Sequence, residues 1–252
     1  MSGHSKWATT KHRKAAQDKK RSAIFSKLSR NITVAAKEGG DPSPENNAAL
    51  AAAIAKAKNY SLPKDKIDSA IKKAFGTGSD AAHYENVVYE GYGPAGVAIY
   101  IEALTDNRNR TAADVRSTFT HNGGNLGTPG SVAFQFERKG QIAIEKSQSP
   151  DEEEFMLQVA DAGADDYEDG DEEWIVITAP TDLINVKNGL EEQGIEVKGY
   201  ELVMEPTTPT EVSVSDAKRI MRLIDKLEEL EDLQNVYHSM GMSDEIAEAL
   251  DD

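Results

Sequence analysis

The sequence predicts an α+β protein with an N-terminal three-helix domain followed by two small ferredoxin-like α/β domains, one inserted in the other. Three observations support this class. Residues 11–75 carry their large apolar side chains at helical spacing. After a glycine linker, residues 76–80, the pattern changes to β-rich runs that alternate with helical segments. A chain of 252 residues is also long enough for two or three small domains with their own cores.

The first 75 residues predict three helices. The first runs over residues 11–37, which lack proline and glycine, and it stops at Gly39-Gly40. Its large apolar residues, Ile24, Phe25, Leu28 and Ile32, all lie in its second half. The first three turns have nothing to bury, so we expect a partner to order them. Two more helices follow, one with Leu50 and Ile54 on a face, the other over residues 61–75 with Ile67, Ile71 and Ala74 inward.

The rest of the chain alternates strands and helices. A hairpin is predicted over residues 86–105, then a helix that begins at Thr111 and is capped with the help of Asp114. After a glycine-rich loop, residues 123–131, a second hairpin is expected around Lys139-Gly140. Further elements are helices over 151–163, 181–194 and 215–232, the last capped by Ser215. Strands are expected over 172–179, 195–206, 210–214 and 233–240, with an extra one near 165–168.

The economical topology inserts the middle of the chain into a domain built from both flanks. We therefore expect a basic helical domain over residues 1–78 and a discontinuous α/β domain over 79–132 plus 207–240. The inserted acidic α/β domain spans 133–206. Residues 241–252 are expected to form an acidic C-terminal tail.

Charge is divided unevenly along the chain. Residues 1–30 hold nine basic residues and one acidic residue, although the whole protein has a formal net charge of −16. Such an asymmetry indicates a polyanion partner for the basic segment, the alternative being a solvated, mobile N-terminus. Twelve acidic residues and no basic one lie between Asp151 and Glu173. They form either a solvated face or a surface that a polyanion repels, which would orient the protein on its partner.

The candidate nucleic-acid-binding residues lie in two places. Arginine pairs well with phosphate, so the loop and helix around residues 105–119 form a second contact region, unless Asp106 and Asp114 simply pair with those arginines. Trp7 either stacks on a base or packs the basic segment onto its own bundle. The full set is Lys6, Trp7, Lys11, His12, Arg13, Lys14, Lys19, Lys20, Arg21, Lys27, Arg30, Arg108, Arg110 and Arg116.

The sequence offers no chemistry for an enzyme. It contains no cysteine, and its five histidines lack metal-ligand spacing, so no metal and no cofactor are expected. Residues 91–96, GYGPAG, match the spelling of a dinucleotide fingerprint, but a strand continues after them where that site needs a helix. We read them as a hairpin turn. No apolar run is long enough for a membrane span, and we expect a cytoplasmic protein.

Several motifs together resemble the YebC/PmpR family. They are GHSKW at residues 3–7, LPKDKIDSAIKKA at 62–74, TDNRNRT at 105–111, GGNLGTPGSV at 123–132 and LQNVYHSM at 233–240. The resemblance covers essentially the whole chain and implies a helical domain followed by two α/β domains, one inserted in the other. Thr10 stands where the family usually has isoleucine, and Pro129 where serine is more usual. Neither change removes a charge.

The resemblance implies a nucleic-acid-binding regulator of gene expression. The family is labelled as probable DNA-binding transcriptional regulators, whereas its mitochondrial relatives activate translation of cytochrome c oxidase subunit one and bacterial members are linked to stalled ribosomes. The target is thus DNA or ribosomal RNA, and ribosomal or polymerase proteins are candidate partners for the acidic domains. Lysines dominate the basic segment, and lysine contacts to phosphate position a protein without specifying a sequence. The sequence leaves the oligomeric state open.

Overall fold

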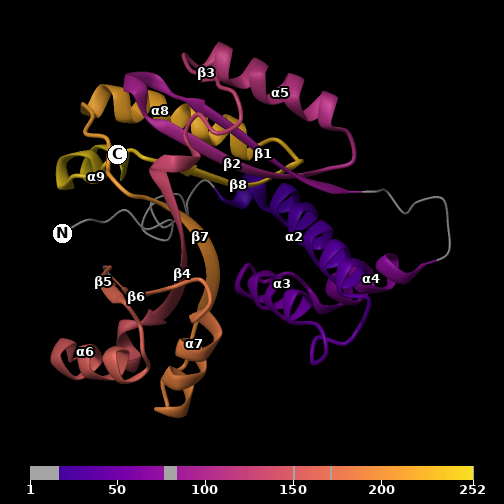
Figure 1. The fold of residues 1–252 in the computed structure, drawn as a ribbon, viewed down its shortest axis with the longest axis vertical. Coiled ribbons are helices and arrows are strands. Elements are labelled where there is room, and N and C mark those ends of the chain that lie inside the picture. Colours follow the sequence, from indigo (N-terminus) through magenta and orange to yellow (C-terminus); the bar gives the residue numbers. More distant parts are fainter. Residues whose placement is uncertain (1–16, 77–83, 150, 171, 252) are drawn as a thin grey trace.

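The structure is a computed structural model that describes residues 17–76, 84–149, 151–170 and 172–251. Of residues 17–23 and residue 251 it describes the backbone alone. The fold class predicted from the sequence is confirmed. A helical domain and two sheets with their helices form three bodies, and the long strands β4 and β7 lead into and out of the inserted one (Figure 1).

The helical domain consists of α2 (Gln17–Gly39), α3 (Ala48–Asn59) and α4 (Lys64–Phe75). Helix α2 packs against both of the others, because its apolar residues from Ile24 onward form one stripe. Asn47 caps α3 by accepting a hydrogen bond from the backbone N–H of Leu50. The buried residues of this small core are Leu28, Ile32, Ala36, Leu50, Ala57, Leu62, Ile67 and Ala70.

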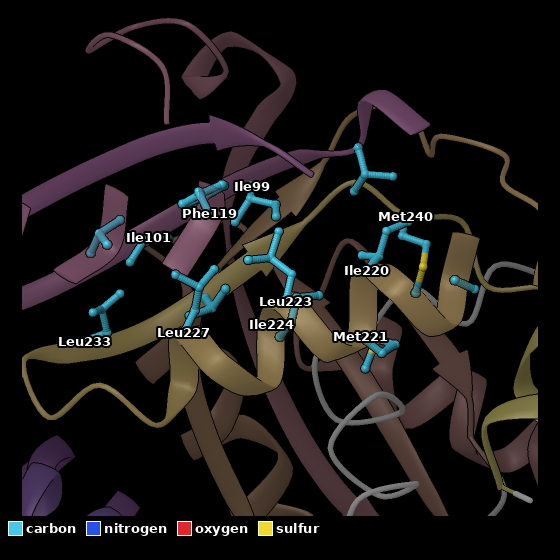
Figure 2. Packing of buried hydrophobic residues seen from close by; sticks show 14 of the residues in the cluster. Ile99, Ile101, Phe119, Ile220, Met221, Leu223, Ile224, Leu227, Leu233 and Met240 are labelled. Atoms are coloured by element: carbon cyan, nitrogen blue, oxygen red, sulfur yellow. The ribbon is translucent and has the colours of Figure 1, made fainter. Parts of the chain in front are cut away.

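The first sheet has the strand order β3-β1-β2-β8 and is antiparallel throughout. Its strands are β1 (Glu85–Tyr92), β2 (Ala98–Thr105), β3 (Asn125–Leu126) and β8 (Leu233–His238). As predicted, residues 91–96 belong to a hairpin that joins β1 to β2. Helices α5 (Arg108–His121) and α8 (Val214–Glu228) pack on one face. Figure 2 shows Leu223 and Leu227 of α8 pointing toward Ile99 and Ile101 of the sheet.

The inserted domain has the strand order β5-β6-β4-β7, also antiparallel. The chain order is β4 (Phe136–Glu145), α6 (Glu152–Asp161), β5 (Asp166–Asp169), β6 (Glu173–Thr178), α7 (Leu183–Glu192) and β7 (Gly199–Pro206). This βαββαβ sequence is the ferredoxin-like topology. All six elements lie between β3 and β8 in the chain, which makes the domain an insertion.

Residues 136–145 form one continuous strand, so the hairpin predicted around Lys139-Gly140 is wrong. Gly140 is needed for close packing and not for a turn. A Cβ there would lie 2.2 Å from Oγ1 of Thr178 and 2.9 Å from Cδ1 of Leu183. The strand expected over 210–214 is reduced to a single bridge between Thr210 and Met240.

Residues 244–251 form helix α9 (Asp244–Asp251), where the sequence predicted an acidic tail. Ile246 is only 4% exposed, and Met242 and Leu250 pack beside it against the first core. Ile246 and Leu250 are four residues apart, the spacing of a helix face that is buried on one side, and Met242 lies just before the helix. The acidic residues between them face outward.

Glu90 of β1 holds the glycine-rich loop of residues 123–131 in place. Its buried carboxylate accepts hydrogen bonds from the backbone N–H groups of Gly130, Val132 and Ala133, at 2.6–2.7 Å. Burial alone would raise the pKa of Glu90, but these three donors outweigh it and the pKa is lowered. The loop is therefore anchored to the sheet through an ionised side chain.

Candidate nucleic-acid interface

The predicted binding residues fall into three groups in the structure. Lys6, Trp7, Lys11, His12, Arg13 and Lys14 lie outside the described residues. Lys19, Lys20 and Arg21 lie in α2, where only the backbone is described. The side chains of Lys27, Arg30, Arg108, Arg110 and Arg116 are described.

Asp232, at the entrance to β8, brings two of these arginines together. Its Oδ1 accepts a hydrogen bond from Arg30 at 2.9 Å, and its Oδ2 accepts one from Arg110 at 2.8 Å. The hydroxyl groups of Thr105 and Thr111 donate to Oδ2 as well, at 3.2 and 2.7 Å. Burial raises the pKa of Asp232, but the donors and the two guanidinium charges outweigh it and the pKa is lowered. The carboxylate is ionised and saturated with donors.

The start of α5 explains the position of Arg110. Asn107, rather than the predicted Thr111, caps the helix by accepting a hydrogen bond from the backbone N–H of Arg110. The Arg110 guanidinium then lies between Asp232 and Asp106, the latter at 2.7 Å. The pairing with Asp106 that the sequence suggested as an alternative to phosphate binding is therefore present. Thr111 lies inside the helix, and its hydroxyl donates a hydrogen bond to Asp232.

The other two arginines of this region are more exposed. Arg108 forms a 3.6 Å ion pair with Glu85, and both side chains are largely in water. Such a pair contributes little to stability and leaves the guanidinium accessible. Arg116, on the exposed face of α5, has no ion pair with any residue that the structure describes.

Lys27 and Arg30 dock the helical domain on the first α/β domain. The ammonium of Lys27 donates to the backbone carbonyl of Glu228, the last residue of α8, at 2.6 Å. A cation at that end of a helix is favoured by the helix dipole. Arg30 donates to the carbonyl groups of Leu104 and Glu231 in addition to Asp232. These two side chains join domains, and their charged groups already have partners within the protein.

Lys56 of α3 makes a second connection between the domains. Its ammonium lies 2.6 Å from the carboxylate of Glu201 in β7 and 3.5 Å from Asn235 in β8. Burial lowers the pKa of Lys56, but the Glu201 carboxylate more than compensates and the pKa is raised. Asn235 in turn donates to Glu102 of β2, which also pairs with Arg138 of β4 at 2.6 Å. One polar network thus links all three domains.

A cavity of about 540 Å³ lies beside Arg30 and Arg110. Five carboxylates line it, those of Asp106, Asp114, Glu229, Glu231 and Asp232, against these two guanidinium groups. The surplus of negative charge repels a phosphate group. The cavity is therefore a poor site for nucleic acid.

Free basic side chains are distributed unevenly over the described domains. In the inserted domain, each of the five basic residues, Arg138, Lys139, Lys146, Lys187 and Lys198, pairs with a carboxylate. In the described part of the helical domain, by contrast, six lysines are exposed and have no side-chain partner. They are Lys37, Lys58, Lys64, Lys66, Lys72 and Lys73. None of these six lysines is among the binding residues predicted from the sequence, although the outward positions of the last four on an amphipathic helix were a usable signal.

The described residues hold no group of three or more histidine, cysteine or acidic side chains placed to bind a metal ion. Within the same residues, no helix is both long and apolar enough to cross a membrane. The fold and the exposed lysines define a three-domain α+β protein whose helical domain has basic side chains available to an anionic partner.

Comparison with known proteins agrees with this class. The family model described as "TACO1/YebC protein N-terminal domain" matches residues 5–77, and the one described as "TACO1/YebC second and third domain" matches residues 84–240. The chain belongs to the YebC family, as its motifs predicted.

Relatives of similar length are known from several bacteria. A protein of Bifidobacterium longum (strain DJO10A), named "Probable transcriptional regulatory protein", is 49% identical over 252 residues, all of both chains. One of Rubrobacter xylanophilus with the same name is 50% identical over 246 residues, 98% of each chain. Among solved structures, that of the conserved hypothetical protein Aq1575 from Aquifex aeolicus has a TM-score of 0.84 and 40% identity, covering 96% of this chain and 99% of that one.

Proposed function

We propose that this protein is a nucleic-acid-binding regulator of gene expression, a DNA-binding transcriptional regulator that acts in the cytoplasm by binding and not by catalysis. The relatives named as transcriptional regulatory proteins support the regulatory role. The observation that carries the binding role is the contrast between the free lysines of the helical domain and the fully paired basic residues of the inserted domain.

This contrast orients the protein on a polyanion. Neutralising a phosphate with a lysine releases a condensed counterion, which favours binding at moderate salt. A lysine that is already paired must first give up its carboxylate and contributes less. The acidic inserted domain, with twelve carboxylates over residues 151–173, is at the same time repelled. The helical domain therefore faces the nucleic acid.

The basic N-terminal segment supplies most of the charge in this proposal. Lys6, Lys11, Arg13, Lys14, Lys19, Lys20 and Arg21 contact phosphates in this proposal. Arg108 and Arg116 are accessible for a second contact, whereas Arg110 and Arg30 are held by Asp232. The arginine-rich region thus has a smaller role than the lysine-rich one.

The second candidate is a translation factor that binds ribosomal RNA. It is favoured by the chemistry of α4, whose sequence KDKIDSAIKKAF contains no arginine, asparagine or glutamine. Those three residue types make the most specific bidentate contacts to base edges in the major groove, whereas lysine contacts to phosphate position a protein without specifying a sequence. A lysine-based surface suits the backbone of structured RNA at least as well as a specific operator.

Co-sedimentation with ribosomes at physiological salt, with excess duplex DNA as competitor, separates the two candidates. Binding that survives the competitor and is lost on deletion of residues 1–21 identifies a translation factor. Release from the ribosome onto DNA supports the transcriptional role. The deletion removes none of the core residues that the structure describes, which begin at Ile24, and circular dichroism checks that the truncated protein is folded. A protein that binds neither partner contradicts the proposed function.

A further inference from the structure

The outward face of α4 combines free lysines with an exposed aromatic ring. Ile67 and Ala70 point into the helical core, each 5% exposed. On the outer side are Lys64, Lys66, Lys72 and Lys73, together with Phe75, whose side chain is 44% exposed. We infer that this face binds single-stranded nucleic acid, with the lysines on the phosphates and Phe75 stacked on a base. The inference rests on the proposed function and names the part of the helical domain that carries it.

Two of the four lysines of α4 are not explained by the stability of the helix. An aspartate four residues before a lysine favours a helical ion pair, yet Asp68 and Lys72 form none in the described structure. Lys64 and Lys66 lie in the first turn, where the helix dipole disfavours a cation. The dipole does favour Lys72 and Lys73 in the last turn. Two of the four cations are therefore placed against the local electrostatics of their own helix.

The spacing along α4 fits a phosphate backbone. Lys66 and Lys73 are seven residues apart, so they lie on one side of the helix and about 10.5 Å apart along its axis. This distance corresponds to roughly three nucleotide steps of a stacked strand at 3.4 Å each. Between them lies Ser69, a small residue whose hydroxyl already donates to the backbone carbonyl of Asp65. No large side chain separates the two ammonium groups on that side.

Phe75 favours a single strand over a duplex. It is three residues from Lys72, the spacing of neighbouring positions on a helix surface. Bases that are not paired offer their flat faces to aromatic side chains, which stack on them without regard to sequence. In a duplex those faces are covered by neighbouring base pairs. An exposed aromatic ring near the free Lys72 thus fits the chemistry of an unpaired strand.

Fluorescence anisotropy with a single-stranded RNA of about 20 nucleotides and a duplex of the same length tests this inference in the full-length protein. The double variant Lys66→Gln/Lys73→Gln should bind the single strand more weakly and reduce the slope of log affinity against log salt by about 1.4. Phe75→Leu should weaken binding about tenfold with no change in that slope, because stacking releases no counterions. The matched control is Lys218→Gln/Arg222→Gln, two exposed cations on α8 without side-chain partners in the described structure. It should leave binding unchanged.

The outcomes separate this inference from the proposed function. If both α4 variants bind like the wild type while deletion of residues 1–21 abolishes binding, the α4 inference is wrong and the proposed function stands. If Phe75→Leu has no effect on the single strand, or if α4 variants weaken only duplex binding, the assignment to unpaired nucleic acid is overturned. If the wild type binds no nucleic acid at all, the proposed function itself fails. Circular dichroism confirms that each variant is folded.

Discussion

The guanidinium of Arg30 lies 2.9 Å from the carboxylate of Asp232, 202 residues further along the chain. The contact joins the helical domain to the first α/β domain. Arg110 reaches the same carboxylate from the start of α5, so a single acidic residue fixes two basic ones. Both arginines were predicted from the sequence to bind nucleic acid, but in the structure their charges pair with a carboxylate of the protein itself.

Replacing Asp232 by asparagine should destabilise the protein by about 2 kcal/mol, because two arginines lose a buried, charge-assisted partner. Urea denaturation measures the change. Asp114→Asn, an exposed carboxylate of α5 that lines the cavity beside Asp232, serves as a comparison. A loss of stability below about 0.5 kcal/mol would show that the contacts of Asp232 with the two arginines do not stabilise the fold.

The lowered pKa of Asp232 makes its contribution depend on pH. The group binds fewer protons when folded, so its stabilising effect is present above the unfolded pKa of about 4 and is lost as pH falls through the folded value. The difference in stability between wild type and Asp232→Asn should therefore be constant from pH 5 to 7 and shrink below about pH 4. A difference that grows on acidification contradicts this explanation.

Glu168 of β5 should show the opposite behaviour. Burial and the neighbouring carboxylates of Glu205 and Asp166 raise its pKa to about 7. Its ionised form is disfavoured in the folded state, so stability falls as pH rises from about 4.5 to about 7. Glu168→Gln should be more stable than wild type by about 2 kcal/mol at pH 8 and nearly equal at pH 4. Thermal unfolding at the two pH values measures this; equal gains at both would rule out the titration of Glu168.

The pair of Lys56 and Glu201 should contribute to the docking of the helical domain. Lys56→Gln removes an ammonium from a carboxylate that is only 14% exposed, and about 2 kcal/mol of stability should be lost. In the variant that also carries Glu201→Gln, the two losses should not add, with a coupling of about 1 kcal/mol. Additive losses would mean that the ion pair is not coupled energetically.

Glu90→Gln should loosen the glycine-rich loop. The glutamine side chain has one acceptor oxygen where the carboxylate has two, and its amide group would face a backbone N–H. With three donors to satisfy, a loss of about 2–3 kcal/mol is expected. Hydrogen exchange at Gly130, Val132 and Ala133 reports the effect locally. Unchanged protection at these three amides would contradict the anchoring role.

The helices and the insertion could be predicted from the sequence because their signals are local. The apolar stripe of α2 and the alternation of strand and helix after residue 84 both follow from residue spacing. The need for glycine at position 140 could not be predicted, because Thr178 and Leu183 create it from distant positions. Asp232 is likewise more than 120 positions away in the sequence from Arg110, Thr111 and Thr105, which contact it in the structure.

The candidate site was predictable only in its overall charge. The count of basic and acidic residues along the sequence placed the basic surface in the first 78 residues, and the free lysines of α4 lie there. Which cations are free depends on the tertiary structure. Lys27 and Arg30 lie on the part of α2 that docks against α8 and β8, whereas Lys66 and Lys73 lie on a helix face that no other described element covers.

The salt dependence of binding to duplex DNA tests the central claim most directly, namely that the basic helical domain binds a polyanion through phosphate contacts. If about seven phosphates are neutralised, log affinity should fall linearly with log salt with a slope of about −6. Deletion of residues 1–21 should make the slope much shallower, leaving only the contribution of the exposed lysines of the described helical domain. A wild-type slope near zero would contradict the claim, because binding would then not depend on the lysines and arginines of this domain.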